Sequence, residues 1–182
     1  MKLILTTIAT VMLVGCGESQ RSTPAPEAKP VEPVAEASQP EPPTAKAPDI
    51  SIHDAVEKGN IEAVKQHLTA GTDVEVKDGE GWTLLQMAAG EGHKEIAELL
   101  IAKGADVNAM NADGLTALFA AILGPHKEMV ELLIAKGADV NVRGFLGMTP
   151  LNMAADEGEK EIADLLRKHG GKTGEELKAE GK

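Results

Sequence analysis

The chain has 182 residues, and its 18 lysines and arginines against 29 aspartates and glutamates give a formal net charge of -11. It contains one tryptophan, two phenylalanines and no tyrosine. An acidic chain with so few rings lacks the basic surface and the base-stacking platforms that nucleic-acid-binding proteins use. Its single cysteine excludes a disulfide framework and a cysteine-based zinc site. The length allows one ordinary domain, built from small and aliphatic side chains, with further segments beside it.

Residues 1–15 are predicted to be a signal peptide, because Lys2 is followed by an uncharged run, 3–14. This run is shorter than the roughly 20 residues that span a bilayer as a helix, and it has the length of a signal-peptide core. The sequence Leu-Val-Gly-Cys that ends at Cys16 resembles the lipobox of bacterial lipoproteins, which implies that Cys16 carries lipid. The expected location is then the cell envelope, on the outer membrane or the outer face of the cytoplasmic membrane. An ordinary secretory peptide with an incidental cysteine is the alternative.

Residues 16–48 are predicted to be a disordered linker. Eight of the ten prolines lie between 24 and 48, among alanine, glutamate, serine and threonine, and no apolar period is present. At about 3.1 Å per residue, such a segment would reach roughly 100 Å when extended. We expect it to give the folded domain reach from its membrane anchor, and the alternative is a proline-rich ligand for another domain.

The rest of the chain repeats with a 33-residue period. The period is shown by Thr83, Thr116 and Thr149, by Gly81, Gly114 and Gly147, and by Gly71, Gly104, Gly137 and Gly170. A fixed period of this size indicates an array of stacked units. We expect an array over 49–171, with units at about 49–77, 78–110, 111–143 and 144–171, followed by a C-terminal tail, 172–182.

Each unit is expected to form two helices. The three threonines are predicted N-caps of the first helix, and the second helix has a 3.6-residue apolar period that ends at a glycine. In the first unit, Gln66 and His67 replace a leucine pair, which predicts an N-terminal cap whose polar side chains face water. Thr173 and Glu176 have the spacing of a capping box for a short last helix.

This pattern resembles the ankyrin repeat. Motifs that open the first helix begin at Gly81, Gly114 and Gly147, and closing motifs begin at Lys103 and Lys136. Where family members usually carry a histidine after the opening threonine, this chain has Gln86, Phe119 and Asn152. The resemblance implies an all-α solenoid of about four 33-residue helix-turn-helix units joined by short hairpin fingers.

Catalysis is not expected, and neither is a cofactor or a metal. The sequence contains no glycine-rich phosphate loop, metalloprotease motif or nucleophile elbow. His93 and His126 are one repeat period apart, at the start of second helices, where the ankyrin pattern places a structural histidine. The neighbouring carboxylates of Asp156 and Glu157 are interpreted as surface charge in a turn.

In ankyrin-like stacks the fingers and first helices bind protein partners, so that the variable positions there are the candidate binding residues. Trp82, Leu115 and Met148 are equivalent in three successive fingers. Such an apolar stripe favours a partner-binding site, because exposed Trp, Met and Arg are common anchors. The alternative is that these side chains pack between adjacent fingers. The candidates are Lys77, Trp82, Met110, Leu115, Leu123, Arg143, Phe145 and Met148.

The expected function is that of an envelope lipoprotein, monomeric, that binds or scaffolds a partner protein without catalysis. The alternative is an inhibitor or protective protein for an enzyme or toxin in the same compartment, which an acidic concave face and a basic partner would favour. A host-directed effector is a further alternative, which the lipobox opposes because anchoring opposes release.

Overall fold

The computed structural model describes residues 49–181, except for the side chain of Phe145. The predicted signal peptide, the lipidated Cys16 and the linker lie outside these residues. The described part is helical and forms no strand beyond one isolated bridge between Lys77 and Thr83, so that the predicted all-α class is confirmed. The helices are α1 (Ile52–Glu57), α2 (Ile61–Thr69), α3 (Leu84–Gly90), α4 (Lys94–Ala102), α5 (Ala117–Leu123), α6 (Lys127–Ala135), α7 (Pro150–Asp156), α8 (Lys160–Lys168) and α9 (Gly174–Ala179).

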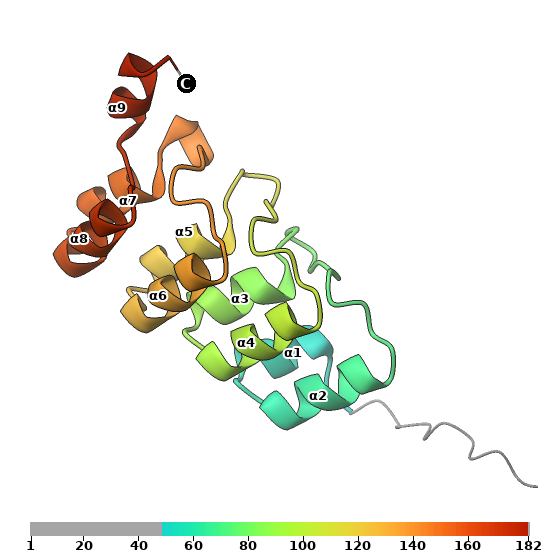
Figure 1. Ribbon diagram of the computed structural model, residues 1–182. Helices are drawn as coiled ribbons and strands as arrows, with labels where there is room; N and C mark the ends of the chain where they lie inside the picture. Colours follow the sequence, from blue (N-terminus) through green and yellow to red (C-terminus); the bar gives the residue numbers. More distant parts are fainter. Residues whose placement is uncertain (1–48, 182) are drawn as a thin grey trace, which may run out of the picture. The chain divides into compact units, whose positions relative to one another are not determined.

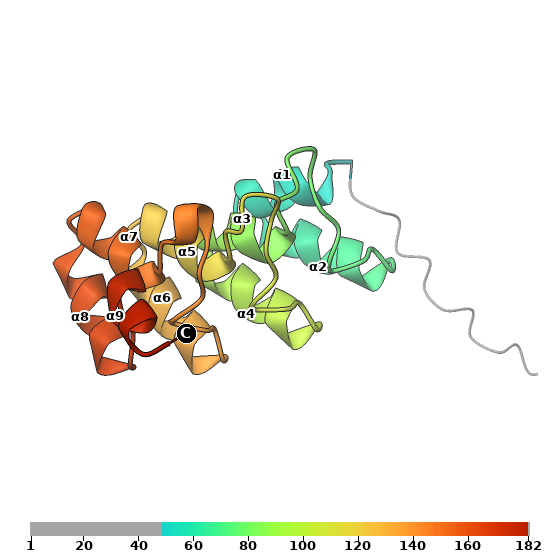
Figure 2. The ribbon, with the colours of Figure 1, turned by 90° about the horizontal axis from the view of Figure 1, so that it is seen from above.

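Helices α1 to α8 form four antiparallel pairs stacked in chain order (Figure 1). The first helices α1, α3, α5 and α7 form one layer, and the second helices α2, α4, α6 and α8 form the other (Figure 2). Each helix contacts its pair partner and the equivalent helix of the next pair, which is the nearest-neighbour packing of a repeat solenoid. None of the helices within residues 49–181 has the length and apolar character needed to cross a membrane.

The core between the layers is aliphatic and continuous. Leu85, Leu118 and Leu151, which follow one another at the repeat period, are all buried and belong to one cluster. Small residues such as Ala88 and Ala121 are fully buried and let neighbouring helices approach closely. Many modest contacts therefore replace the few large ones that aromatic side chains would supply.

The hydrogen bonds predicted for the threonine caps are present in two of three repeats. Thr83 and Thr149 each accept a hydrogen bond from the third residue of the helix and complete a capping box with Gln86 and Asn152. Thr116 makes no such bond, and its buried hydroxyl has no hydrogen-bond partner. Thr116 is thus the N-cap residue of α5, as predicted, but its hydroxyl does not make the predicted bond to the helix, and the apolar Phe119 has no side-chain acceptor to complete a capping box.

The second helices end as expected. Gly104 and Gly137 follow α4 and α6 with φ of +99° and +94°, a left-handed conformation that side chains with a Cβ avoid. Their backbone amides donate back to carbonyls of the preceding helix turn. The glycines therefore stop each second helix and turn the chain towards the next finger.

His93 and His126 each link their repeat to the previous one by a hydrogen bond. Nε2 of His93 lies 3.0 Å from the carbonyl oxygen of Glu57, and Nε2 of His126 lies 3.0 Å from that of Gly90. Glu57 and Gly90 are the last residues of α1 and α3, whose carbonyls have no partner within the helix. The structural role predicted for both histidines is therefore confirmed.

A second ladder of hydrogen bonds runs along the other ends of the repeats. Asn108 donates from Nδ2 to the carbonyl of Gly137 at 3.1 Å and accepts the Asp139 amide at 2.8 Å. Asn141 repeats this arrangement one unit later. Glu75 takes this place in the first unit and accepts the next amide at 2.7 Å, but a carboxylate has no N–H to donate.

The N-terminal cap differs from the prediction at one of its two polar residues. Gln66 is exposed, as expected, but His67 is buried, at 8% exposure. Its Nε2 lies 2.7 Å from the carbonyl oxygen of Ile50, in the segment that leads into α1. The imidazole turns inward because it can satisfy a backbone carbonyl there, which a leucine could not.

The backbone is strained at Pro125, in the turn between α5 and α6. Pro125 has φ of +21°, although the proline ring favours about -65°. The equivalent residues in the neighbouring repeats, Gly92 and Gly158, have φ of +73° and +75°. The turn therefore has a left-handed geometry that glycine adopts freely and proline does not.

Helix α9 closes the C-terminal end of the described chain. The predicted capping box between Thr173 and Glu176 is present, and Leu177 is buried. The Glu176 carboxylate also pairs with Arg167 of α8, with 2.8 Å from Nη1 to Oε1. The backbone amide of Thr173 and the guanidinium of Arg167 lower the pKa of Glu176 from its ordinary value.

One further ion pair joins the second helices. Lys127 of α6 and Glu161 of α8 lie 2.9 Å apart, Nζ to Oε2. This hydrogen bond raises the pKa of the lysine and lowers the pKa of the glutamate. Because both side chains are exposed, the pair adds little to stability.

Candidate partner-binding surface

Three loops connect the helix pairs, and we call them finger 1 (residues 70–83), finger 2 (103–116) and finger 3 (136–149). Fingers 1 and 2 turn in the same way. Oδ1 of Asp78 accepts the amides of Glu80 and Trp82 at 2.9 and 2.8 Å. Asn111 does the same in finger 2, at 3.0 and 2.9 Å. A side-chain oxygen at the bend therefore fixes the tip of each of these two fingers.

Gln86 fastens finger 2 to helix α3. Its Nε2 donates to the carbonyls of Ala109 and Leu115 at 2.9 and 2.8 Å, while its Oε1 accepts the Thr83 amide. The side chain is only 1% exposed, so that these bonds form away from water. A single glutamine therefore fixes both sides of the next finger to the start of α3.

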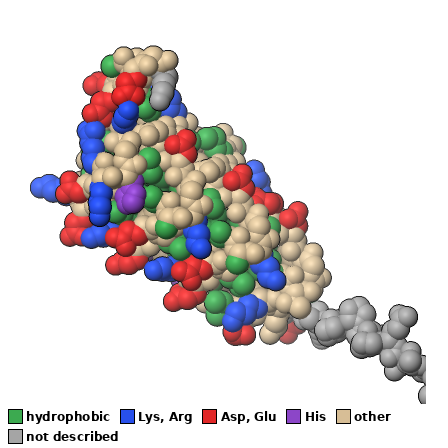
Figure 3. Space-filling view, in the orientation of Figure 1, with side chains coloured by type: hydrophobic (Ala, Val, Ile, Leu, Met, Phe, Trp, Pro, Cys, Tyr) green, Lys and Arg blue, Asp and Glu red, His purple; other side chains and the backbone are tan. Residues whose placement is uncertain are grey.

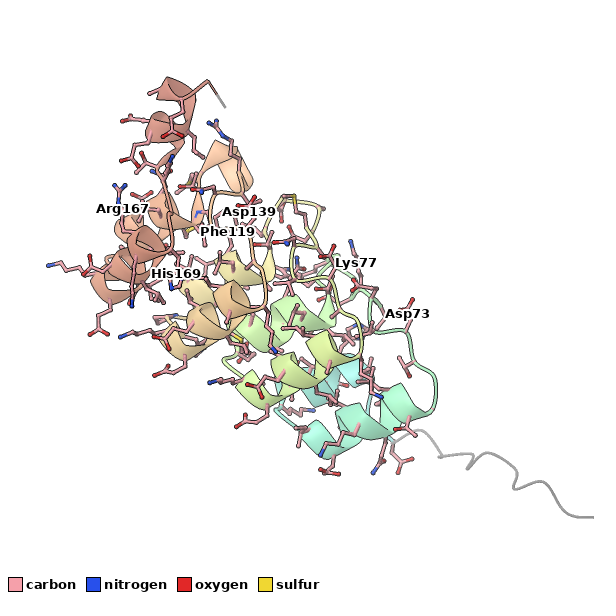
Figure 4. All side chains as sticks on the ribbon, in the orientation of Figure 1. Asp73, Lys77, Phe119, Asp139, Arg167 and His169 are labelled. Atoms are coloured by element: carbon pink, nitrogen blue, oxygen red, sulfur yellow. The ribbon has the colours of Figure 1, made fainter. Side chains whose placement is uncertain are left out.

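Finger 3 is built differently because Phe119 occupies the place of Gln86. Figure 4 shows Phe119 among the helices, where it is fully buried. The ring of Phe119 reaches Gly144, where an added Cβ would lie 2.6 Å from the ring atom Cε2. The bend of finger 3 therefore has no side chain that could cap it, and a short 3₁₀ turn, Phe145–Gly147, forms instead.

This turn exposes an apolar side chain at the end of finger 3. Leu146 has φ of +55° and is 82% exposed. It is the most exposed of the large apolar residues in the described part of the chain. Finger 3 keeps the backbone hydrogen bonds of the other two tips, from the Gly144 amide to the Met148 carbonyl and from the Gly147 amide to the Gly144 carbonyl. It lacks only the side-chain bonds at the bend, and its tip carries an apolar residue.

An open groove of about 520 Å³ lies between finger 1 and the first helices. Its apolar lining comes from Trp82 of finger 1, Met87 of α3 and Leu123 of α5. Leu123 is 46% exposed, and Trp82 is half-buried with part of its side chain packed against the core. The groove therefore offers a fixed aromatic ring and two flexible aliphatic side chains to a partner.

Four carboxylates share the groove with these apolar groups: Glu57, Asp78, Glu80 and Glu91. No lysine or arginine is among its lining residues. None of the four belongs to an ion pair within residues 49–181, where the ion pairs lie on the second helices and near α9. The groove thus combines an apolar lining with concentrated negative charge.

The predicted binding residues fall into two groups. Trp82 and Leu123 line the groove together. Lys77 and Met110 lie side by side on fingers 1 and 2, since Nζ of Lys77 is 3.4 Å from the carbonyl of Met110. Met110 is 44% exposed, whereas Leu115 is half-buried and packs against the core. The apolar stripe is therefore divided between exposed side chains and side chains with a packing role.

The remaining predicted residues lie on finger 3. Arg143 is partly buried, and its Nη2 lies 3.4 Å from the carbonyl of Gly174 at the start of α9. Met148 is half-buried, and the side chain of Phe145 lies outside the described part of the structure. These three are not among the residues that line the groove.

Several residues of the groove and of the finger tips were not among the binding residues selected from the sequence: Glu57, Asp78, Glu80, Met87, Glu91 and Leu146. Glu57 lies one repeat period before Gly90, a variable position of the next repeat, so that the period itself was a usable signal. Leu146 had the same signal, because it lies one repeat period after Asp113 and two after Glu80, which are exposed at the tips of fingers 2 and 1.

Charged and apolar side chains are mixed on the face of the molecule that Figure 3 shows. On the face drawn in Figure 3, apolar groups reach the surface among acidic and basic ones along the whole stack. Within residues 49–181, no group of three or more histidine, cysteine, aspartate or glutamate side chains is arranged to bind a metal ion.

Comparison with known families gives a match over the repeats. The family described as ankyrin repeats (3 copies) matches residues 52–144, about half of the chain. The chain belongs to the ankyrin-repeat family. The family assignment and the helical solenoid predicted from the 33-residue period are thus both confirmed.

Curated proteins match over shorter segments. Protein phosphatase 1 regulatory subunit 27 from Homo sapiens is 42% identical over 50 residues, which is 28% of this chain and 32% of that protein. Protein phosphatase 1 regulatory subunit 12A from Mus musculus is 41% identical over 56 residues, 31% of this chain and 5% of that protein. Notch-regulated ankyrin repeat-containing protein A from Danio rerio is 39% identical over 46 residues, 25% of this chain and 41% of that protein.

The chain therefore spans well under half the length of these relatives. The repeats form a protein-interaction module, and they imply a protein partner whose identity is unknown.

Proposed function

We propose that this chain is a lipid-anchored protein of the cell envelope that binds a partner protein through fingers 1 and 2 and the adjoining first helices, without catalysing a reaction. The observation that carries the binding role is the open groove, in which Trp82, Met87 and Leu123 are available to a partner. An aromatic ring on a rigid scaffold loses little conformational freedom on binding, which favours it as an anchor.

The non-catalytic role is supported by the relatives. Two of them are named as regulatory subunits, proteins that act on an enzyme rather than as one. The groove residues include no histidine, cysteine, serine, threonine or lysine, so that the four groove carboxylates would have no such partner in an acid–base or nucleophilic mechanism.

The anchor is supported by the sequence alone. Cys16, the single cysteine of the chain, follows an uncharged run of signal-peptide length and precedes the proline-rich segment. Lipid on Cys16 would contribute about 0.8 kcal/mol for each buried CH₂ group, and several chains would make anchoring stable. The linker would let the repeats reach a partner at a distance from the membrane.

Site-specific cross-linking tests the binding surface. A photoreactive residue is placed at Trp82 in the full chain in cells, and a matched one at Glu98, which is exposed on α4 away from the groove. We expect a cross-linked protein from position 82 that position 98 does not give, and the same protein, once purified, to bind the chain. The same cross-linked products from both positions would contradict the proposed surface.

Metabolic labelling with a fatty acid tests the anchor. We expect wild type to incorporate label and to fractionate with membranes, and Cys16→Ser to lose both properties. Undiminished labelling of the Cys16→Ser variant would refute lipidation at this residue.

A second role, as inhibitor or protective protein for an enzyme or toxin of the same compartment, is favoured by the regulatory-subunit relatives and by the acidic groove. The purified partner decides between the two. If the partner is an enzyme whose activity falls as the repeats bind, the chain is an inhibitor, and if activity is unchanged, it is a scaffold.

A further inference from the structure

We propose that the groove selects a partner segment that carries arginine side chains next to apolar ones, so that the occupant is a basic, amphipathic peptide stretch of the partner protein. This inference rests on the proposed binding function and specifies the chemistry of the partner. The charge, the lining and the open shape of the groove support it.

The groove is negatively charged. The four groove carboxylates come from three places in the chain: Glu57 ends α1, Asp78 and Glu80 lie in finger 1, and Glu91 follows α3. They are brought together only by stacking, and no cation lines the groove with them. Like charges gathered in this way repel one another, so that a cationic occupant gains from all of them at once.

An indole ring lies in the same groove. Trp82 lines the same groove as these carboxylates, and its backbone amide is fixed by Asp78 at 2.8 Å. A cation over an indole face is attracted by the ring quadrupole, and the planar guanidinium of arginine stacks there better than an ammonium. Carboxylates beside the ring can then accept the guanidinium N–H groups.

The shape of the groove suits a peptide. The groove is open to solvent along one side rather than closed around a small molecule, and Met87 and Leu123 extend its apolar lining from α3 to α5. A free cation such as a polyamine would leave these two side chains without a partner. A peptide with leucine-like residues between its arginines satisfies both the charged and the apolar part of the lining.

Trp82 is the only tryptophan of the chain, so that its fluorescence reports on this groove alone. The probe is a short synthetic peptide in which arginine alternates with leucine and alanine, titrated into the full chain. Two matched peptides have glutamine or lysine in place of arginine. We expect saturable binding of the arginine peptide, weaker binding of the lysine peptide, and no measurable binding of the glutamine peptide.

Charge-removing variants locate the effect. Glu80→Gln combined with Glu91→Gln removes two exposed groove charges, and Glu98→Gln combined with Glu131→Gln removes two exposed charges from the second helices. We expect the first variant to bind the arginine peptide roughly tenfold more weakly at low salt and the control variant to bind it as wild type does. Added salt should reduce the difference, since exposed charges are screened over about 8 Å at physiological ionic strength.

Three results would overturn the inference: equal affinity of the two double variants, equal affinity for the arginine and glutamine peptides, or a change in Trp82 fluorescence with spermidine at the same concentrations as with the arginine peptide. The last would show a general cation site rather than a peptide site. Cross-linking from position 82 is independent of these results, so that a specific cross-linked protein with a failed peptide test leaves the binding function intact and rejects only the basic peptide.

Discussion

The contact between a histidine of one repeat and a glycine of the previous one predicts a measurable energetic coupling. Nε2 of His126 lies 3.0 Å from the Gly90 carbonyl, and the same imidazole passes directly over Gly92. A Cβ on residue 92 would lie 2.7 Å from both Cε1 and Nδ1 of the ring. Since Gly92 also has φ of +73°, an alanine there meets two separate penalties.

Each variant has its own expected loss of unfolding free energy. Gly92→Ala should lose about 1–2 kcal/mol of unfolding free energy through its left-handed backbone. Displacement of the ring should break its hydrogen bond, for about 1 kcal/mol more. His126→Ala removes the same hydrogen bond and the packing of the ring, for about 1–2 kcal/mol. In the double variant the alanine meets no ring, so that only its backbone penalty is added to the cost of His126→Ala.

Urea unfolding followed by circular dichroism measures the four free energies of this cycle. We expect Gly92→Ala to cost about 1 kcal/mol less in the His126→Ala background than in wild type. Gly104→Ala is the matched control, because Gly104 has φ of +99° but no atom within 4 Å of its added Cβ. Its cost should be the same in both backgrounds.

A second control is His169→Ala. His169 is exposed at the end of α8, without a hydrogen bond from its side chain within the described residues, and its loss should change stability by less than about 0.5 kcal/mol. If Gly92→Ala and His126→Ala were additive within about 0.3 kcal/mol, the ring would not be held against the glycine and the reasoning would be refuted.

Three more predictions use the same repeat logic. Glu75→Asn should raise the midpoint of thermal unfolding, because an asparagine amide can donate to the Gly104 carbonyl as the later asparagines of the ladder do, for about 0.5–1.5 kcal/mol; an unchanged midpoint would show that the first unit does not take part in the ladder. Pro125→Gly should stabilise by about 1 kcal/mol or more in urea unfolding, because glycine adopts the left-handed turn without strain, and a loss of stability would contradict the strain. Acidification should release α9. The pKa of Glu176 is lowered in the folded state, so that its contribution is complete above the ordinary glutamate pKa and is lost as the pH falls through the lowered value. The protection of the α9 amides, which compares the observed exchange rate with the intrinsic rate at each pH, should therefore fall at low pH in wild type, and Glu176→Gln should already be less protected near neutral pH; identical protection profiles would remove Glu176 as the cause.

The sequence predicted the architecture because repeat contacts are local. Helices pack only against their partner and the next repeat, so that the 33-residue period that defines one unit also specifies its neighbours. The glycine stops, the roles of His93 and His126, and the capping box at Thr173 could be predicted for the same reason. Each depends on a residue type at a fixed position within the repeat.

The exceptions depended on which group lies opposite a side chain, even within one unit. Thr116 lies at the N-cap position but its hydroxyl makes no bond, and Phe119 cannot complete a capping box as Gln86 and Asn152 do. His67 was expected to face water, yet a carbonyl of the segment before α1 draws it inward. In both cases the outcome depends on which partner lies opposite, and a pattern of residue types does not contain that information.

The sequence by itself determined the helical solenoid and its period, while the partner-binding surface, the signal peptide, the lipid on Cys16 and the linker are still predictions. The tertiary structure decided which of the candidate side chains are available. Stacking places Trp82 and Leu123 in one groove with carboxylates from α1, finger 1 and the turn after α3, and it packs part of Leu115 against the core. The physical reason is that exposure and charge density depend on distances between residues a repeat or more apart, whereas periodicity describes each repeat by itself.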